Sequence, residues 1–201
     1  MNTDKLVSTS KKLYTFFKVF RKIILITMSV AILIMAVITA IHFIDPGVVV
    51  GEDFHMIDVG QLSIELAPEY APDGSAVLTY SWSLMVLGAI GAALAYYALG
   101  IVLRILLPMT QGQPFAPSIG KDIRKMSFIC LTLGIVENIS NILDTANIIH
   151  TYKLAELINS ASVKPNYLVD LTFLLLFFAL LLMSHIFNYG AQLQQLSDET
   201  L

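Results

Sequence analysis

One polar stretch inside an apolar segment holds the side chains best placed to do chemistry. Residues 135–150 read IVENISNILDTANIIH. The polar side chains that crowd its middle are those of Glu137, Asn138, Asn141, Asp144 and Asn147. An acid inside a membrane-spanning helix is by default a candidate proton or cation site. Acids and amides in such a helix also hold neighbouring helices together through hydrogen bonds, so two interpretations stand side by side.

The spacing of these residues predicts which way they face. At about 100° per residue, Glu137, Asn141 and Asp144 fall within one narrow sector of a helix, and the opposite half is apolar. The polar half must therefore face other helices or a wet cavity. Glu137 lies near the middle of the span, where no Lys, Arg or His is expected at the same depth. We expect its carboxyl group to be protonated and hydrogen-bonded.

Counting depth at about 1.5 Å per residue also suggests neighbours for the polar residues. His42 and Asp144 lie at matching depth near the outer surface, so we expect that they pair. At the depth of Glu137, the preceding apolar segment offers Gly88 and Gly91, small residues of the kind that let helices approach closely. One acid without a deep base favours helix–helix contact over transport, and a proton or cation site centred on Glu137 is the alternative.

The composition identifies the elements that must position these residues. The chain has 201 residues, of which 56% are hydrophobic and only 13% are charged, whereas a soluble domain carries about 25% charged residues. Four apolar runs reach the roughly 20 residues that a spanning helix needs. We expect an all-α membrane protein with a single four-helix transmembrane domain over residues 1–201. Its spans are predicted at about 23–44, 83–107, 126–149 and 168–187.

The basic residues predict the orientation of these spans. Ten of the 12 Lys and Arg residues precede the first span or lie at or between the facing ends of the second and third, while residues 45–80 have none and carry seven acids. Positive charge stays in the cytoplasm. Both termini are therefore expected inside, with an outer loop at 45–80, an inner loop at 108–125 and a cytoplasmic tail at 188–201. The expected location is the bacterial cytoplasmic (inner) membrane.

Three segments outside the spans have patterns of their own. Residues 6–20 place apolar side chains at helical spacing among lysines, as in a helix lying on the inner leaflet or a basic topology anchor. In the outer loop, alternation on both sides of Gly60-Gln61 predicts a small β-hairpin, and Asp73-Gly74 predicts a turn. In the inner loop, Pro108 is expected to end the second span and Gly112 to permit a tight turn.

Several motifs that would indicate an enzyme do not occur in the sequence. There is no Cys-x-x-Cys, no His-Glu-x-x-His, no Gly-Lys-Ser/Thr phosphate loop and no Gly-x-Ser-x-Gly. The single cysteine, Cys130, excludes an intramolecular disulfide. The four histidines are scattered without metal-binding spacing. We therefore expect no enzyme, no catalytic residue, no cofactor and no bound metal.

Two short stretches carry a resemblance to a known family. They are QGQPF in the inner loop and HIFNYGAQLQQLSDETL at the end of the chain. With the four spans, they resemble domain-of-unknown-function family 2975, small bacterial membrane proteins with a Gly-x-Pro-Phe loop and a Phe-x-x-Gly-x-x-Leu-Gln tail ending in Glu-Thr. The matching residues are Gly112, Pro114, Phe115, Phe187, Gly190, Leu193, Gln194, Glu199 and Thr200. After Pro-Phe the family often has Glu-Asn, where this chain has Ala116-Pro117.

The resemblance implies no known activity. Its members are often encoded beside a small helix-turn-helix regulator, which implies a cytoplasmic partner for this chain. We therefore expect a sensing or regulatory membrane protein whose inner loop and tail are the output surface, and the alternative is a proton- or cation-coupled transporter subunit that uses Glu137. The expected partners are the lipid bilayer, that regulator and a further copy of the chain in a homo-oligomer, without direct binding of nucleic acid. The tail is expected to reverse at Gly190 and to bury Leu193 and Leu196 against Phe115.

Overall fold

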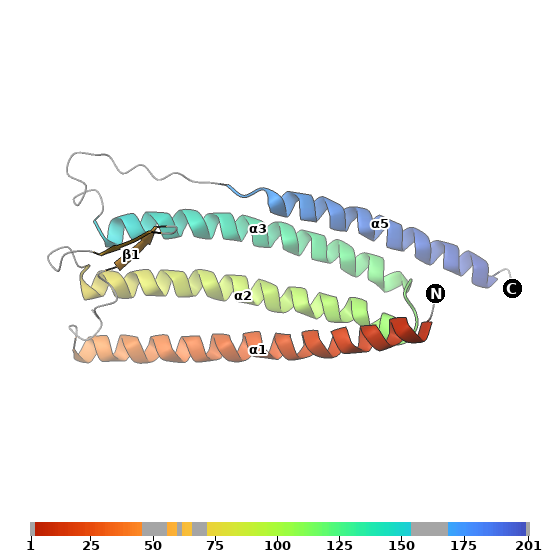
Figure 1. The fold of residues 1–201 in the computed structure, drawn as a ribbon, viewed down its shortest axis with the longest axis horizontal. Coiled ribbons are helices and arrows are strands. Elements are labelled where there is room, and N and C mark those ends of the chain that lie inside the picture. Colours follow the sequence, from red (N-terminus) through yellow and green to blue (C-terminus); the bar gives the residue numbers. More distant parts are fainter. Residues whose placement is uncertain (1–2, 46–55, 60–61, 66–71, 154–168, 200–201) are drawn as a thin grey trace. The chain divides into compact units, whose positions relative to one another are not determined.

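Four long helices dominate the fold. The computed structural model describes residues 3–45, 56–59, 62–65, 72–153 and 169–199. Figure 1 shows the elements in chain order: α1 (Thr3–Ile44), β1 (Met56–Val59), β2 (Leu62–Glu65), α2 (Gly74–Thr110), α3 (Pro117–Thr151) and α5 (Thr172–Glu199). Each of the four helices is long and apolar enough to cross a membrane. This is the pattern of a multi-pass membrane protein.

The chain divides into two compact units, each assembled from pieces of several helices. Unit 1 comprises residues 1–28, 90–138 and 169–201, and unit 2 comprises residues 29–89 and 139–168. The start of α1, the end of α2, most of α3 and all of α5 thus belong to unit 1. The remainder of α1, the strands, the start of α2 and the end of α3 belong to unit 2.

The strands of unit 2 pair in an antiparallel two-stranded sheet. Met56 lies opposite Glu65, and Val59 lies opposite Leu62. These are the residues whose alternation predicts strands, because successive side chains of a strand point to opposite faces. Residues 60 and 61, between the strands, lie outside the described part of the chain.

Helices α1 and α2 extend beyond the expected ends of their spans. α1 is one unbroken helix of 42 residues, so residues 6–20 and the first span belong to the same helix. α2 continues to Thr110 with Pro108 inside it. Pro108 lies in the last turn, where its carbonyl oxygen accepts hydrogen bonds from the backbone N–H groups of Gln111 (2.9 Å) and Gln113 (3.0 Å). The proline therefore precedes the end of the helix instead of marking it.

The start of α2 replaces the expected turn at Asp73-Gly74. The carbonyl oxygen of Asp73 accepts hydrogen bonds from the backbone N–H groups of Ala76 (2.9 Å) and Val77 (3.0 Å). Its carboxylate accepts a hydrogen bond from the Ser75 hydroxyl, and this bond lowers the pKa of the exposed Asp73 carboxyl. Asp73 is therefore the N-cap of α2, a position that aspartate favours.

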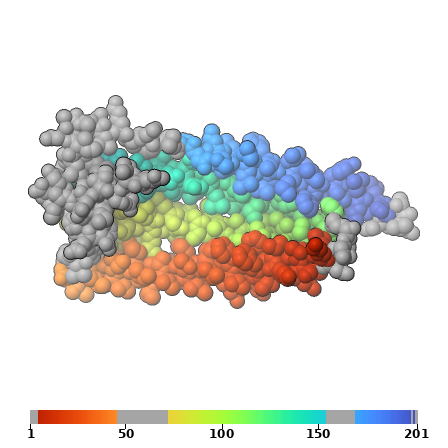
Figure 2. Space-filling model, viewed as in Figure 1, coloured from red at the N-terminus to blue at the C-terminus, as the bar shows by residue number. Residues whose placement is uncertain are grey.

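Figure 2 gives a space-filling view of the chain, with α1 in red to orange and α5 in blue. Large apolar side chains of both helices are exposed: in α1, Leu33 is 65% exposed, and in α5, Leu175 is 74% exposed. A soluble protein would bury such side chains, whereas a bilayer covers them at no cost. The described core is correspondingly small, and it includes Ile101 and Ile119, both fully buried.

Candidate functional site: the inner loop and the end of helix α5

The loop between α2 and α3 is a tight turn built around one glycine. Gly112 has a φ of +80°, a left-handed conformation that glycine adopts at no steric cost. The expectation of a tight turn at Gly112 is thus confirmed. α3 then begins at Pro117, where the missing N–H of proline costs nothing because the first turn of a helix has no acceptor for it. The loop between the two helices is therefore short and comprises residues 111–116.

Phe115 joins this loop to α5. Its ring lies 5.9 Å from the ring of Phe187, centroid to centroid. It also lies directly against Gly190, where an added Cβ would come within 2.9 Å of Phe115 Cδ1. The ring remains 41% exposed. Phe115 therefore covers the glycine of the tail motif and still presents an apolar surface.

Contacts between α3 and α5 lie next to this loop and hold the two helices together. The hydroxyl of Ser184 donates a hydrogen bond of 2.8 Å to the carbonyl oxygen of Gly120, and Ser184 is only 1% exposed. A Cβ on Gly120 would overlap the side chain of Asn188, and one on Gly134 would overlap Phe173. These contacts pair the beginning of α3 with the end of α5, so the two helices lie side by side and antiparallel (Figure 1). The lack of a side chain at two glycines allows this close approach.

A cavity of about 240 Å³ lies between the loop and α5. Its lining comes from both family-motif stretches and from the residues next to them: Gln113, Phe115, Ala116, Pro117, Ala191, Gln194 and Gln195. The lining combines an aromatic ring, small apolar side chains and three amides. The described lining residues carry no charged group, so they offer apolar and amide contacts and no charged ligand for a metal or a phosphate.

The structure brings most of the motif residues together and corrects the course of the tail. Phe115, Phe187 and Gly190 are in contact, and Gln194 shares the cavity with Phe115. Gly112 and Pro114 belong to the adjoining turn. The expected reversal at Gly190 is wrong, because α5 runs unbroken from Thr172 to Glu199.

The far end of the tail does not take part in this contact. Leu193 is 49% exposed and Leu196 is 60% exposed, so these leucines do not bury against Phe115 as expected. Glu199 is exposed at the last position of α5. Thr200 lies outside the described residues.

Asn138, one of the polar residues of α3, is hydrogen-bonded to the segment that leads into α5. Its Nδ2 donates to the carbonyl oxygen of Asp170 (3.0 Å), and its Oδ1 accepts from the backbone N–H of Asp170 (2.9 Å). Nδ2 also donates to the carbonyl oxygen of Gly134 (2.8 Å). The side chain therefore satisfies backbone groups just before the first turn of α5.

Two further polar residues bond α3 to α2 within unit 2. Asp144 accepts a hydrogen bond of 2.9 Å from the hydroxyl of Tyr80, and Asn147 donates one of 2.9 Å to the hydroxyl of Ser83. The expected pair of His42 with Asp144 is wrong. His42 Nδ1 is buried without a hydrogen-bond partner among the described residues.

Glu137 and Asn141 differ from the other polar residues of α3. Both are exposed in the single chain, and neither side chain makes a hydrogen bond to another described residue. The expectation of a buried, hydrogen-bonded Glu137 is therefore not met. Gly88 and Gly91 have open space around them, with no atom within 4 Å of an added Cβ, so they do not form the close helix contact that their small size suggested.

Sequence reasoning missed Tyr80 as the partner of Asp144 and Ser184 as the partner of Gly120. The phenol of a tyrosine can donate a hydrogen bond to a carboxylate, so Tyr80 was a possible donor that the sequence analysis did not consider. Ser184 gave no signal, since a lone serine in an apolar run often bonds within its own helix. Among the described residues, no group of three His, Cys, Asp or Glu side chains is placed to hold a metal ion.

The fold and the loop contact agree with the family comparison. The family model described as "Protein of unknown function (DUF2975)" matches residues 65–201. This range includes both motif stretches and three of the four long helices, and the chain belongs to this family. No curated protein matches the chain, and no solved structure matches it.

Proposed function

We propose that this membrane protein senses or regulates, and that the surface formed by the inner loop and the end of α5 binds a cytoplasmic partner. The observation that carries the proposal is the packing of Phe115 on Gly190, which couples the loop to a membrane-spanning helix. A shift of α5 against α3 changes what Phe115 covers, and so changes the cavity beside it. The activity proposed is binding and not catalysis.

The exposed leucines of α5 suit such a partner. Leu193 and Leu196 lie after the apolar run of the helix, among glutamines, and each is about half exposed or more. Apolar side chains past the bilayer need a protein cover, since water does not favour them. A small helix-turn-helix regulator, which the family resemblance implies, is the partner we propose.

The proposed orientation places this surface in the cytoplasm of a bacterial cell, at the inner membrane, with both termini inside. The basic residues at this end of the helices support it. A reporter that is active only in the cytoplasm tests it directly. Fused after Leu201, the reporter should be active, and placed at Asp73 it should be silent. Activity at Asp73 would contradict the four-span arrangement.

Site-specific photocrosslinking in native membranes tests the partner surface. A crosslinker at Leu193 or Leu196 should give an adduct with the regulator, and the adduct should disappear in a strain that lacks the regulator gene. Leu182 is the matched control, because it is 63% exposed on the same helix but within the apolar run. Protein adducts from Leu182 alone, or none at all, would overturn the proposal.

The alternative is a proton- or cation-coupled transporter subunit. It has one observation in its favour, the exposed carboxyl group of Glu137 in the middle of an apolar helix. Polar groups inside a membrane need a cover other than lipid. A second copy of the chain would supply such a cover for Glu137 and Asn141, and so a homo-oligomer remains part of the proposal.

A further inference from the structure

A groove at the basic end of α1 has the features of a lipid headgroup site. It has a volume of about 480 Å³ and lies between α1 and α2 within unit 1. Its basic lining residues are Lys18, Arg21 and Lys22. They immediately precede the apolar run of α1, which places them at headgroup depth.

Residues of α2 hold Arg21 in this groove, and no acid pairs with it among the residues that the structure describes. Its guanidinium carbon lies 4.0 Å from the centre of the Tyr96 ring, a cation–π arrangement. A Cβ on Gly100 would lie 3.5 Å from the same carbon, so the guanidinium lies close to α2 at this glycine. Arg21 Nε is buried without a hydrogen-bond partner among the described residues.

The positive charges of the groove lack a counterion in the described part of the chain. The ion pair found there joins Lys125 to Asp122 on α3, and none involves Lys18, Arg21 or Lys22. A guanidinium that is partly buried and unpaired is costly. A phosphate group would remove this cost, because arginine presents several donors to phosphate oxygens and the two lysines add point charges.

The groove also has an apolar part beside its basic part. Leu25, Ile26 and Leu103 line it together with the basic residues. Leu25 and Ile26 follow Lys22 on α1, toward the middle of the apolar run. A soluble phosphate would use only the charged part, whereas a phospholipid would use both, with its acyl chains along the leucines and isoleucine.

We propose that the groove between α1 and α2 binds an anionic phospholipid, whose headgroup phosphate contacts Arg21, Lys18 and Lys22. Basic pockets between membrane helices recognise such headgroups. The lipid would then stabilise the approach of α1 to α2 at Gly100, so the composition of the bilayer would influence the packing of unit 1.

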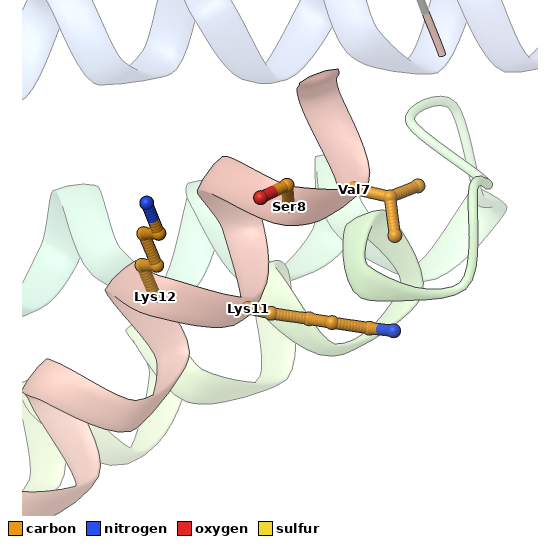
Figure 3. Close-up of a pocket in the computed structure, with 4 residues that line it drawn as sticks. All are labelled: Val7, Ser8, Lys11 and Lys12. Carbon is orange, nitrogen blue, oxygen red and sulfur yellow. The ribbon is translucent and has the colours of Figure 1, made fainter. Parts of the chain in front are cut away.

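A second basic pocket on α1 provides the control. It has a volume of about 440 Å³ and is lined by Val7, Ser8, Lys11 and Lys12 (Figure 3). In Figure 3 the ammonium groups of Lys11 and Lys12 point away from one another. Among its described lining residues there is no aromatic ring, and Val7 is the one apolar residue. The pair Lys11 and Lys12 thus matches Lys18 and Lys22 in charge and helix but not in surroundings.

Lipid retention of the purified full-length chain tests the proposal. Dioleoyl phosphatidylglycerol and dioleoyl phosphatidylcholine are added in equal amounts in detergent micelles, and the bound lipid is counted by native mass spectrometry. The original chain should retain phosphatidylglycerol preferentially. Lys18→Gln with Lys22→Gln leaves the Arg21–Tyr96 stack in place and should weaken this retention on the order of tenfold.

The controls distinguish a specific lipid site in the groove from nonspecific electrostatic attraction of the lipid to lysines. Lys11→Gln with Lys12→Gln should change retention less than twofold. Equal losses in the two double variants would overturn the groove as the site. Equal retention of the two lipids by the original chain would also overturn the proposal, and so would displacement of phosphatidylglycerol by excess inorganic phosphate, which would indicate a site for soluble anions.

Discussion

The side-chain amide of Asn138 makes two hydrogen bonds to the backbone of Asp170, one through Nδ2 (3.0 Å) and one through Oδ1 (2.9 Å). This pairing copies the way one backbone bonds another. It ties α3 to the residue that precedes α5, and the Asp170 carboxylate in turn accepts a hydrogen bond of 2.8 Å from the backbone N–H of Thr172. The role of Asn138 in this apolar helix is therefore structural.

Replacing Asn138 by aspartate should therefore destabilise the chain. The change keeps the size of the side chain but removes both hydrogen bonds that Nδ2 donates, and it turns a carboxylate oxygen toward two carbonyl oxygens. We expect a loss of about 1–3 kcal/mol in the free energy of unfolding, measured by denaturant titration in micelles. Asn141→Asp is the matched control, and an equal loss there would contradict this role of Asn138.

The hydrogen bond between Tyr80 and Asp144 should show coupling in a double-mutant cycle. Tyr80→Phe removes the donor, and Asp144→Leu removes the acceptor. Interhelical hydrogen bonds in membrane proteins contribute about 0.6 kcal/mol on average and up to about 1.7 kcal/mol, so we expect a coupling energy in that range. Tyr97→Phe combined with Asp144→Leu should show none, because Tyr97 is half exposed and makes no described hydrogen bond. If the effects of the two changes in the first cycle are additive, the hydrogen bond does not contribute to stability.

Glycines at the α3–α5 contact should be more sensitive to alanine than glycines elsewhere. Gly134→Ala forces the side chain of Phe173 to move, which costs about 1–3 kcal/mol when a packed contact is overfilled. Gly91→Ala meets open space and should be neutral or stabilise by up to about 1 kcal/mol, because alanine favours a helix. The thermal unfolding midpoint in micelles measures both. A Gly91→Ala variant as unstable as Gly134→Ala would argue against the contact.

Glu137 separates the regulatory proposal from the transport alternative. If the carboxyl group carries no proton for function, Glu137→Gln should keep the regulatory output and Glu137→Leu should keep the fold, since neither removes a described hydrogen bond. If it carries protons or cations, Gln should abolish transport as fully as Leu. The fluorescence of a pH-sensitive dye in proteoliposomes measures proton transport. Acidification of the proteoliposome lumen that depends on Glu137 would favour the transporter.

Some of this architecture follows from the sequence alone. A run of about 20 apolar residues fixes a span because the bilayer demands that length, and Gly112 indicates a turn because few other residues adopt its φ. The partner of Asp144 does not follow. Counting along a helix gives the depth of His42 but not the direction in which its side chain points, so depth alone selected the wrong donor.

The end of α5 shows a second limit. Glycine near the end of an apolar run usually indicates a helix stop, and Gly190 led to the expectation of a reversal there. In the fold it serves a packing purpose, since Phe115 occupies the space that a side chain would fill. A glycine that ends a helix and one that admits a neighbour look alike in sequence. Only the position of the loop tells them apart.

That contact gives the sharpest test of the proposed output surface. Gly190→Leu should push Phe115 away from α5, because even a Cβ would lie within 2.9 Å of its ring. The loop should then separate from the helix while α5 itself stays folded. A cysteine pair at Ala116 and Gln194, both of which line the cavity, reports the separation in a Cys130→Ser background.

The pair should form a disulfide efficiently in native membranes when Gly190 is present, and the yield should fall severalfold with Gly190→Leu. Gly88→Leu makes the same change in a helix where an added Cβ meets nothing, and it should leave the yield unaltered. Loss of the disulfide should be accompanied by loss of the regulator adduct from Leu193, since the partner is proposed to read the loop and α5 together. An adduct that persists after the loop has separated would place the binding surface on α5 alone, and an unaltered disulfide would show that Phe115 does not hold the loop in place.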